Sequence, residues 1–411
     1  MTTTPSVRPG TAGAPPDTDV PPDGGLPPGL RLSYERTVPR DTAHRRQVGE
    51  VFVTDSAQTG PDDFHMAFEV LRAHSLWSDR AGSAYHDPMA SAEAARQSIF
   101  VLLHRHVGIP VTLPFSLQRI TLRVLDPEAY RSDRRTALRG TVHYRVAERA
   151  GRGADVTSMT LRGTVRIGGR PAMALNARLA FMSQEDYDVF RAFQRGRKPV
   201  ADAVRTAARP LPPAAVGRAL AANVVLGAPA EPAPATPDAA PDAGPRLLLA
   251  ADTTHPAFFD HDYDHVPGPL MVEGMRQAAL VAWAAAQGAH PAPPGAEPYG
   301  AGPYTTGEGG ARAPLVAGCE AAFLDFVEFE ADVDYRAVAG PADADGRIPV
   351  DVAVRQFGRD VLTGRIDLLP EPAFGPGPAA ARADRAAAPG AAPAPPSPRI
   401  PPAPSADAHG G

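Results

Sequence analysis

The sequence predicts an α+β fold made of two similar units in tandem, each a long buried helix wrapped by a curved antiparallel sheet, which pack as an intrachain pseudo-dimer. Three observations predict it. A Glu-x-x-Arg-Gln pattern occurs twice, 180 residues apart. Both copies lie in segments that are apolar nearly all the way round, and strand-like segments flank both. With 411 residues the chain is long enough for two or three domains.

The repeated pattern lies within a longer region of similarity. The two copies are Glu93, Arg96, Gln97 and Glu273, Arg276, Gln277. Each helix pattern ends at a glycine fifteen residues after its Glu, Gly108 and Gly288, as expected for a C-terminal stop. A histidine-containing loop precedes each helix. The first loop holds His74, and the second holds His255, His261 and His265.

Alternating segments before and after each helix predict the strands. In the first unit they lie at 48–55, 64–70, 116–125, 136–149, 155–169 and 170–182. In the second unit they lie at 221–227, 246–252, 321–335 and 348–370. A helix that is apolar on every side must be covered on every side, and a curved antiparallel sheet provides that cover. This is the hotdog arrangement, present twice in one chain.

Proline distribution places the domain boundaries. Of 48 prolines, 25 lie in three Ala/Pro/Gly-rich stretches that lack the apolar side chains needed to offset ordering entropy. The expected segments are a disordered N-terminal tail at 1–42, a first hotdog domain at 43–183, a helical connector at 184–215, a second hotdog domain at 216–370 with a Pro/Ala-rich loop at 228–245, and a disordered C-terminal tail at 371–411. Ser183 is the expected N-cap of the connector helix.

Composition excludes several classes of protein. The net charge of −5 gives no reason to expect a nucleic-acid partner. The longest apolar run, 278–286, is far shorter than the ~20 residues of a membrane helix, so no membrane association is expected. Cys319 is the single cysteine, which fits a reducing cytoplasm and predicts a cytoplasmic protein. We expect Cys319 to be a small buried residue.

The repeated Glu and Arg are the first candidates for a site. Residues at i and i+3 share a helix face, so Glu93 with Arg96 and Glu273 with Arg276 are neighbours. One interpretation is a surface ion pair worth ~0.2 to 0.5 kcal/mol. Because an ionised pair on a wrapped helix pays several kcal/mol in desolvation, a cleft explains the repeated pair better.

Histidines near the second helix are further candidates. His261 and His265 lie just before the helix starts, where free N–H groups can receive a developing oxyanion. A histidine beside a carboxylate supplies acid/base chemistry near neutral pH. We expect His74, His86 and His104 to be structural. The Asp and His residues at 260–265 alternate too tightly for a recognised metal-ligand spacing, so no metal is expected.

A basic cluster lies in the connector. Its members are Arg191, Arg195, Arg197, Lys198, Arg205 and Arg209. It is interpreted as a solvated face that could also steer an acidic carrier protein.

Several stretches together resemble the AfsA family of γ-butyrolactone (A-factor type) signal synthases. They are "HRRQVGEVFVTD", "DPMASAEAARQSIFVLLHRHVGIP", "VGR" followed by "NVVL", and "HPAFFDHDYDHVPGPLMVEGMRQAA". The "PGPLMVEGMRQ" part also resembles the P-G-x-L-x-x-E stretch of hotdog dehydratases. Gly274 stands inside the helix pattern at a cost of ~1 kcal/mol relative to alanine, and is expected to permit close approach of the partner helix.

The resemblance implies an acyltransferase without cofactor or metal. Such enzymes move a β-ketoacyl group from an acyl carrier protein to the hydroxyl of dihydroxyacetone phosphate, and the ester then closes to a butenolide phosphate. The site is expected to combine Glu93 as base with His261, His265 and Arg276 of the second unit, where Arg276 binds the phosphate or the β-keto oxygen. Glu273 with Arg96 would be a second site or a structural one.

Two other functions remain open. A hotdog dehydratase or thioesterase would use water in place of a phosphorylated acceptor and would need no phosphate-binding arginine. A non-catalytic protein that binds an acyl chain or lactone for regulation would keep its ligand after loss of both Glu93 and Glu273.

Overall fold

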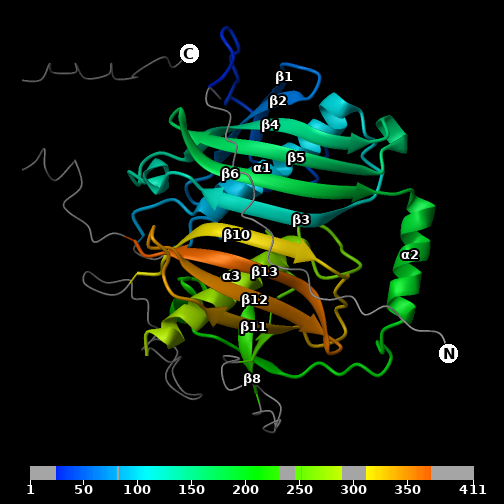
Figure 1. The fold of residues 1–411 in the computed structure, drawn as a ribbon, viewed down its shortest axis with the longest axis vertical. Helices are drawn as coiled ribbons and strands as arrows, with labels where there is room; N and C mark the ends of the chain where they lie inside the picture. The colour runs from blue at the N-terminus through cyan, green and yellow to red at the C-terminus, as the bar shows by residue number, and fades with distance from the viewer. Residues whose placement is uncertain (1–24, 81–82, 231–245, 251, 289–311, 372–411) are drawn as a thin grey trace, which may run out of the picture. The chain divides into compact units, whose positions relative to one another are not determined.

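The computed structural model describes residues 25–80, 83–230, 246–250, 252–288 and 312–371 (Figure 1). Most of the two predicted tails and of the Pro/Ala-rich loop lies outside the described residues. The last part of the expected N-terminal tail is packed on the first unit. Val38 is buried, and its N–H donates to the carbonyl of Val53 at 3.0 Å.

The first unit has the predicted order of two strands, a long helix and an antiparallel run. Its elements are β1 Val53–Gln58, β2 Asp63–Val70, α1 Pro88–Val101, β3 Phe115–Val124, β4 Leu138–Ala150, β5 Ser158–Ile167 and β6 Arg170–Phe181. The helix continues as a π-helical segment, Leu102–Val107, and ends at Gly108 with φ 77°, which confirms the predicted glycine stop. The first predicted strand begins later than expected, because a 3₁₀ turn, Val48–Glu50, precedes it.

The second unit repeats this order. After the connecting helix α2 Gln184–Gly196, its elements are β7 Ala208–Pro210, β8 Leu226–Pro229, β9 Leu247–Leu249, α3 Gly268–Ala286, β10 Leu315–Phe323, β11 Asp334–Ala339, β12 Ile348–Gln356 and β13 Arg359–Leu369. Ser183 caps α2, since its side chain accepts from the N–H of Asp186. The single strand predicted at 321–335 is instead the ends of two strands, β10 and β11, with irregular chain between them.

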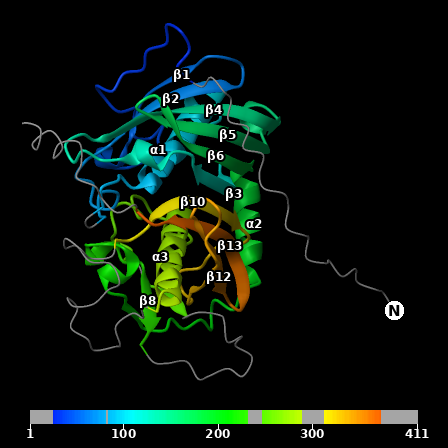
Figure 2. The ribbon, with the colours of Figure 1, turned by 60° about the vertical axis from the view of Figure 1, so that its left-hand side comes forward.

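One antiparallel sheet joins the two units. Among the described residues its order is β1-β2-β4-β5-β6-β3-β10-β13-β12-β11-β9-β8-β7. The strands β3 and β10 pair at the centre, where Cys319 lies opposite Leu122. Outward from this pair, the first unit has the order β3-β6-β5-β4-β2-β1 and the second has the order β10-β13-β12-β11-β9-β8-β7. The first six strands of the two halves match, and β7 is an additional edge strand of the second. Figure 2 shows both helices on the same side of this sheet.

Gly274 is needed because of the sheet and not because of the partner helix. A Cβ at this position would lie 2.5 Å from Cζ of Tyr335 in β11, whose ring is fully buried. The expected close approach of the partner helix is therefore wrong. Because Gly274 has no side chain, α3 can pack directly against the Tyr335 ring, which belongs to the same unit.

We expect Gly274→Ala to destabilise the protein by about 1–2 kcal/mol. Overpacking costs about 1–3 kcal/mol, and better helix propensity returns at most about 1 kcal/mol. Urea unfolding measures the difference. Gly196→Ala, at a helical position with nothing within 4 Å of the new Cβ, is the matched control and should be neutral or stabilising. A Gly274→Ala protein as stable as the wild type would contradict this packing argument.

Candidate active site

Glu93 is the centre of a buried ionic cluster on α1. Its Oε2 accepts from Nε of Arg96 at 2.8 Å, and its Oε1 accepts from Nη2 of Arg96 at 2.9 Å and from Nε2 of Gln97 at 2.9 Å. Arg45 also donates to Oε1. Burial raises the pKa of Glu93, but the charges of Arg96 and Arg45 and the hydrogen bonds from Arg96 and Gln97 outweigh it and lower the pKa to about 2.

Glu273 is the centre of an equivalent cluster on α3. Arg218 donates from Nε to Oε1 at 3.1 Å and pairs through Nη2 with Oε2 at 2.8 Å. Gln277 donates to Oε1 at 2.8 Å, and Nη1 of Arg276 lies 3.4 Å from Oε2. The Glu, Arg and Gln of the sequence repeat therefore have equivalent positions in the structure.

The extra arginines, Arg45 and Arg218, belong to the same repeat and were missed by the sequence reasoning. Gln97 and Gln277 each donate to the backbone carbonyl five positions after this arginine and accept from the N–H seven positions after it. These backbone partners are Glu50 and Phe52 in the first unit and Asn223 and Val225 in the second. The shared spacing in "RRQVGEVF" and "RALAANVV" is the signal that could have identified both arginines.

His74 and His255 support these clusters and have equivalent positions. Nε2 of His74 lies 3.3 Å from Oε2 of Glu50, and Nε2 of His255 lies 2.9 Å from Oδ1 of Asn223. In both rings Nδ1 accepts from backbone N–H groups of the following turn. With both ring nitrogens engaged, His74 is structural, as predicted.

The two clusters differ in their access to solvent. The Arg276 side chain is only 2% exposed, and its Nη1 lies 3.1 Å from Oδ2 of Asp87 at the start of α1. The Arg96 side chain is 22% exposed. The second cluster is therefore closed by a carboxylate from the first unit, whereas the first cluster is open on one side.

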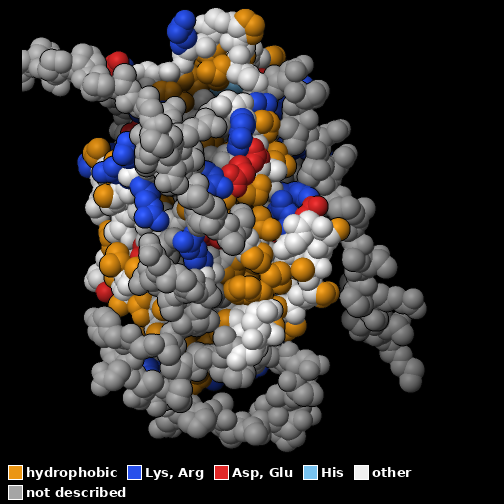
Figure 3. Space-filling model, turned by 90° about the vertical axis from the view of Figure 1, so that its left-hand side faces the viewer, with side chains coloured by type: hydrophobic (Ala, Val, Ile, Leu, Met, Phe, Trp, Pro, Cys, Tyr) orange, Lys and Arg blue, Asp and Glu red, His pale blue; other side chains and the backbone are white. Residues whose placement is uncertain are grey.

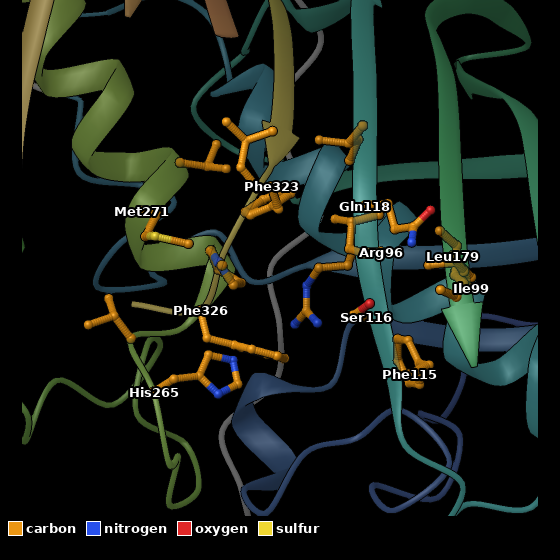
Figure 4. A pocket seen from close by; sticks show the side chains of 18 of the residues that line it. Arg96, Ile99, Phe115, Ser116, Gln118, Leu179, His265, Met271, Phe323 and Phe326 are labelled. Atoms are coloured by element: carbon orange, nitrogen blue, oxygen red, sulfur yellow. The ribbon is translucent and has the colours of Figure 1, made fainter. Parts of the chain in front are cut away.

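The open side of the first cluster faces a cavity of about 430 Å³. Its wall is mainly apolar, and the polar groups on it include Glu93, Arg96 and His265. Apolar lining residues come from α1, the central strands, α2 and the start of α3. They include Ile99, Phe115, Leu117, Leu179, Phe190, Met271, Phe323 and Phe326. Figure 4 shows Arg96 and His265 projecting into this space from different elements. An apolar cavity with few polar groups is typical of a site for an acyl chain with a polar head.

His265 is oriented by a carboxylate that α2 holds in place. Its Nδ1 lies 2.6 Å from Oδ1 of Asp264. The hydroxyl of Tyr187 donates to the same carboxylate at 3.1 Å, and Nε of Arg191 donates to it at 3.1 Å. The hydrogen bond from His265 is the largest effect on Asp264 and lowers its pKa. Nδ1 of His265 thus carries the proton and Nε2 is left as the basic nitrogen.

The structure brings together only some of the predicted site residues. Glu93, Arg96, His265 and Glu273 line the cavity, but Arg276 does not. His261 is not a lining residue either; it lies against the ring of Tyr263, with ring centroids 4.2 Å apart. Burial is the largest effect on His261 and lowers its pKa, and the charge of Arg96 acts in the same direction.

Half of the basic cluster of the connector is engaged in ion pairs. Arg191, Arg195 and Lys198 all contact the carboxylate of Glu328, which is fully buried. The interpretation as a solvated face is therefore wrong for Arg191 and Lys198, whose side chains are buried, whereas the Arg195 side chain is 41% exposed. Their charges anchor the connector to the second unit. Arg197, Arg205 and Arg209 are exposed, so steering of an acidic carrier protein by these three stays a prediction. Figure 3 shows the face on the other side of the molecule from α2, where the visible Lys and Arg side chains stand in separate groups.

Within the residues that the structure describes, Cys319 and possible metal ligands are the other candidates for chemistry. Cys319 is buried, as predicted, and burial raises the pKa of its thiol to about 12, which makes it a poor nucleophile. In this part of the chain, no three His, Cys, Asp or Glu side chains are grouped as metal ligands would be. None of the described helices combines the length and hydropathy of a membrane span.

The lowered pKa of Glu93 predicts a pH-dependent contribution to stability. The folded pKa of about 2 lies below the ordinary 4.5, so this contribution is complete above pH 4.5 and is lost as the pH falls toward 2. It amounts to about 3 kcal/mol. Urea unfolding as a function of pH should show the stability gap between wild type and Glu93→Gln narrowing below pH 4.5. Glu185→Gln, at an exposed position of α2, should show no such change; a constant gap for Glu93→Gln would refute the argument.

Two helix-and-sheet units that share one sheet, with an open ionic cluster and an apolar cavity where they meet, define a tandem hotdog protein. The chain belongs to the AfsA family, described as the A-factor biosynthesis hotdog domain, which matches residues 31–183 and 200–291. The resemblance and the fold predicted from the sequence are both confirmed. The second matched segment ends before β10, but the unit itself continues to β13.

Relatives of this chain carry one name. A protein of Streptomyces virginiae, named 2-oxo-3-(phosphooxy)propyl 3-oxoalkanoate synthase, is 31% identical over 243 residues, which cover 59% of this chain and 76% of the relative. A protein of Streptomyces coelicolor with the same name is 27% identical over 345 residues, covering 83% and 95%. Among solved structures, the 12:0-ACP thioesterase from Umbellularia californica has a TM-score of 0.40 and 11% identity, covering 75% of this chain and 94% of that one.

Proposed function

We propose that this chain is an acyltransferase of γ-butyrolactone signal biosynthesis, which moves a β-ketoacyl group from an acyl carrier protein thioester to the hydroxyl of dihydroxyacetone phosphate. The name of its relatives describes the product of such a transfer, a 3-oxoalkanoate ester of that three-carbon phosphate. The observation that carries the proposal is the cavity, which combines an apolar wall with an oriented histidine and an arginine. The carrier protein as donor and the cytoplasmic location remain predictions.

In this mechanism His265 is the general base. Its Nε2 takes the proton of the acceptor hydroxyl as the hydroxyl oxygen attacks the thioester carbonyl. The tetrahedral intermediate then collapses, the carbon–sulfur bond breaks, and the proton returns to the carrier thiolate. Asp264 holds the required tautomer, and Tyr187 and Arg191 hold Asp264.

Glu93 has a different role from the one predicted. Both of its oxygens accept hydrogen bonds from cationic or amide donors, and its pKa is about 2. A carboxylate in this state is a weak base near neutral pH. We therefore assign Glu93 as the residue that positions Arg96 toward the cavity, and the base function to His265.

The helix α3 provides the partner for the developing charge. It begins at Gly268 after Pro267, which offers no side-chain cap, and Gly268 lines the cavity. Pro269 has no N–H, and the N–H of Met271 donates to the carbonyl of Pro267. The N–H groups of Gly268 and Leu270 are therefore the ones suited to receive the oxyanion of the tetrahedral intermediate. The corresponding start of α1 is capped by Asp87, which accepts from the N–H of Met89 at 3.0 Å. The first cluster is thus the working site, and the second is structural.

The test is incubation with β-ketoacyl carrier protein and dihydroxyacetone phosphate, followed by mass spectrometry. The expected product is the phosphorylated ester. Free β-keto acid or a dehydrated thioester, formed equally well without the acceptor, would identify the thioesterase or dehydratase alternative. Binding of the acyl chain without any turnover would identify the regulatory alternative.

A further inference from the structure

The two ionic clusters differ at the residue just before each helix. Asp87 precedes α1 and Pro267 precedes α3, with nearly the same backbone angles, φ −68° and ψ 119° against φ −63° and ψ 139°. In the second cluster, Oδ2 of Asp87 lies 3.1 Å from Nη1 of Arg276. In the first cluster, Arg96 is the counterpart of Arg276, but Pro267 has no carboxylate to offer it.

One guanidinium nitrogen of Arg96 is consequently available to a ligand. Its Nε and Nη2 donate to Glu93, while Nη1 makes no hydrogen bond with any of the described residues. The guanidinium also lies over the ring of Phe100, 4.9 Å from its centroid, which fixes its plane. Figure 4 shows this guanidinium pointing into the cavity. An oriented cation with a free donor at the wall of an apolar cavity is suited to bind an anion.

A second basic side chain stands at an equivalent position in both clusters. Asp79 and Asp260 are equivalent, because each accepts from two consecutive N–H groups, those of Ala219 and Leu220 or of Arg46 and Gln47. The residues that follow these two aspartates are Arg80 and His261. In the second cluster the charge of Arg80 acts on Asp87 together with that of Arg276. In the first cluster the equivalent pair is Arg96 and His261.

We propose that the phosphate of the acceptor binds in the first cluster, at the position that corresponds to the carboxylate of Asp87 in the second cluster. Arg96 holds the phosphate, and His261 lies beside it. This rests on the proposed function, since it names the place of that acceptor. Asp87 is in this sense an internal stand-in for the ligand. A phosphate monoester carries close to two negative charges at neutral pH and three acceptor oxygens, which suits a guanidinium with a free donor.

The acceptor is the favoured source of this phosphate. In a three-carbon molecule the phosphate lies a few bonds from the hydroxyl, so Arg96 and His265, which line the same cavity, can hold the two ends of one acceptor. The phosphodiester of a carrier arm lies at the opposite end of the arm from the thioester, and so outside the cavity when the thioester is at His265.

The test places a carboxylate at position 267, as the chain itself does at position 87. Pro267→Asp should fill the anion site, and Pro267→Asn is the control with the same shape and no charge. By titration calorimetry, dihydroxyacetone phosphate should bind Pro267→Asp about 10- to 150-fold more weakly than wild type, the range for loss of one hydrogen bond to a charged group. Pro267→Asn should bind within about threefold of wild type, since it adds no charge. Equal affinity of the Asp and Asn variants would overturn the proposal.

A substitute variant, a second ligand and a comparison with product formation distinguish the remaining outcomes of this experiment. If thermal melting shows that Pro267→Asp does not fold, Arg96→Gln replaces it and should lose binding, while Arg96→Lys keeps part of it; wild-type affinity of Arg96→Gln would overturn the proposal. Pantetheine 4′-phosphate is the second probe, and competition by it alone would assign the site to the carrier arm instead. Binding is measured without an acyl donor. Expected binding with no ester product would retain the phosphate site and reject the transfer function.

Discussion

Replacing His265 by glutamine is expected to lower the rate of acyl transfer by about 10²- to 10⁴-fold, the usual contribution of a positioned general base. The ring is held by Asp264 at 2.6 Å and lines the cavity, so its Nε2 is placed to accept a proton from a bound hydroxyl. Glutamine keeps a similar volume and can still contact Asp264, but its amide cannot accept a proton from the hydroxyl near neutral pH. Single-turnover transfer from a β-ketoacyl carrier protein measures the chemical step directly.

The same argument predicts smaller effects for the neighbouring residues. His261→Gln is the matched comparison, because it makes the same replacement four positions earlier in the same loop, at a residue placed beside the phosphate and not at the reacting hydroxyl. It should affect the KM for the phosphorylated acceptor more than the rate at saturation. Tyr187→Phe removes one of the hydrogen bonds to Asp264 and should shift the pH–rate profile without abolishing transfer. Equal loss of rate at saturation for His261→Gln and His265→Gln would remove His265 from the role of base.

Much of the fold follows from patterns that are local in the sequence. Each apolar helix and each alternating strand can be recognised from a window of about 10 to 20 residues. The Glu-x-x-Arg-Gln repeat then relates the two units. The errors lie where tertiary contacts decide. The irregular segment between β10 and β11 contains Glu328, whose carboxylate forms ion pairs with Arg191 and Arg195 of α2. Gly274 looked like a contact between helices because its true neighbour, Tyr335, lies 61 positions away in sequence.

The site was predictable in composition but not in its division of roles. The sequence identifies Glu93, Arg96 and His265 as candidates because a charged group on an apolar helix and a histidine beside a helix start are local features. Spacing does not distinguish Arg96 from Arg276, since both follow a Glu by three positions, and the predicted site assigned the phosphate or the β-keto oxygen to Arg276. Only the structure distinguishes them, because Asp87 reaches Arg276 across the junction of the two units. The tertiary arrangement, and not the spacing along the chain, decides which arginine is accessible from the cavity.

Replacing Asp87 should strongly reduce stability. Its side chain is buried and lies 3.1 Å from Arg276, with the buried Arg80 nearby. Asp87→Asn keeps the helix cap to Met89 but removes the charge, so the cationic guanidiniums lose their counterion in a dry environment. Breaking a buried ion pair on one side costs about 3–5 kcal/mol, and urea unfolding should show a loss of this size.

A double variant tells the loss of charge apart from loss of packing at this position. Asp87→Asn combined with Arg276→Gln removes both members of the pair, and part of the lost stability should return, because removing both charges of a buried pair costs less than stranding one. Asp252→Asn is the control for the chemical change itself, since Asp252 also accepts from a backbone N–H but is exposed. That control should change stability by less than about 0.5 kcal/mol. If the double variant is no more stable than Asp87→Asn alone, the carboxylate acts through packing, and the second cluster is not closed by its charge.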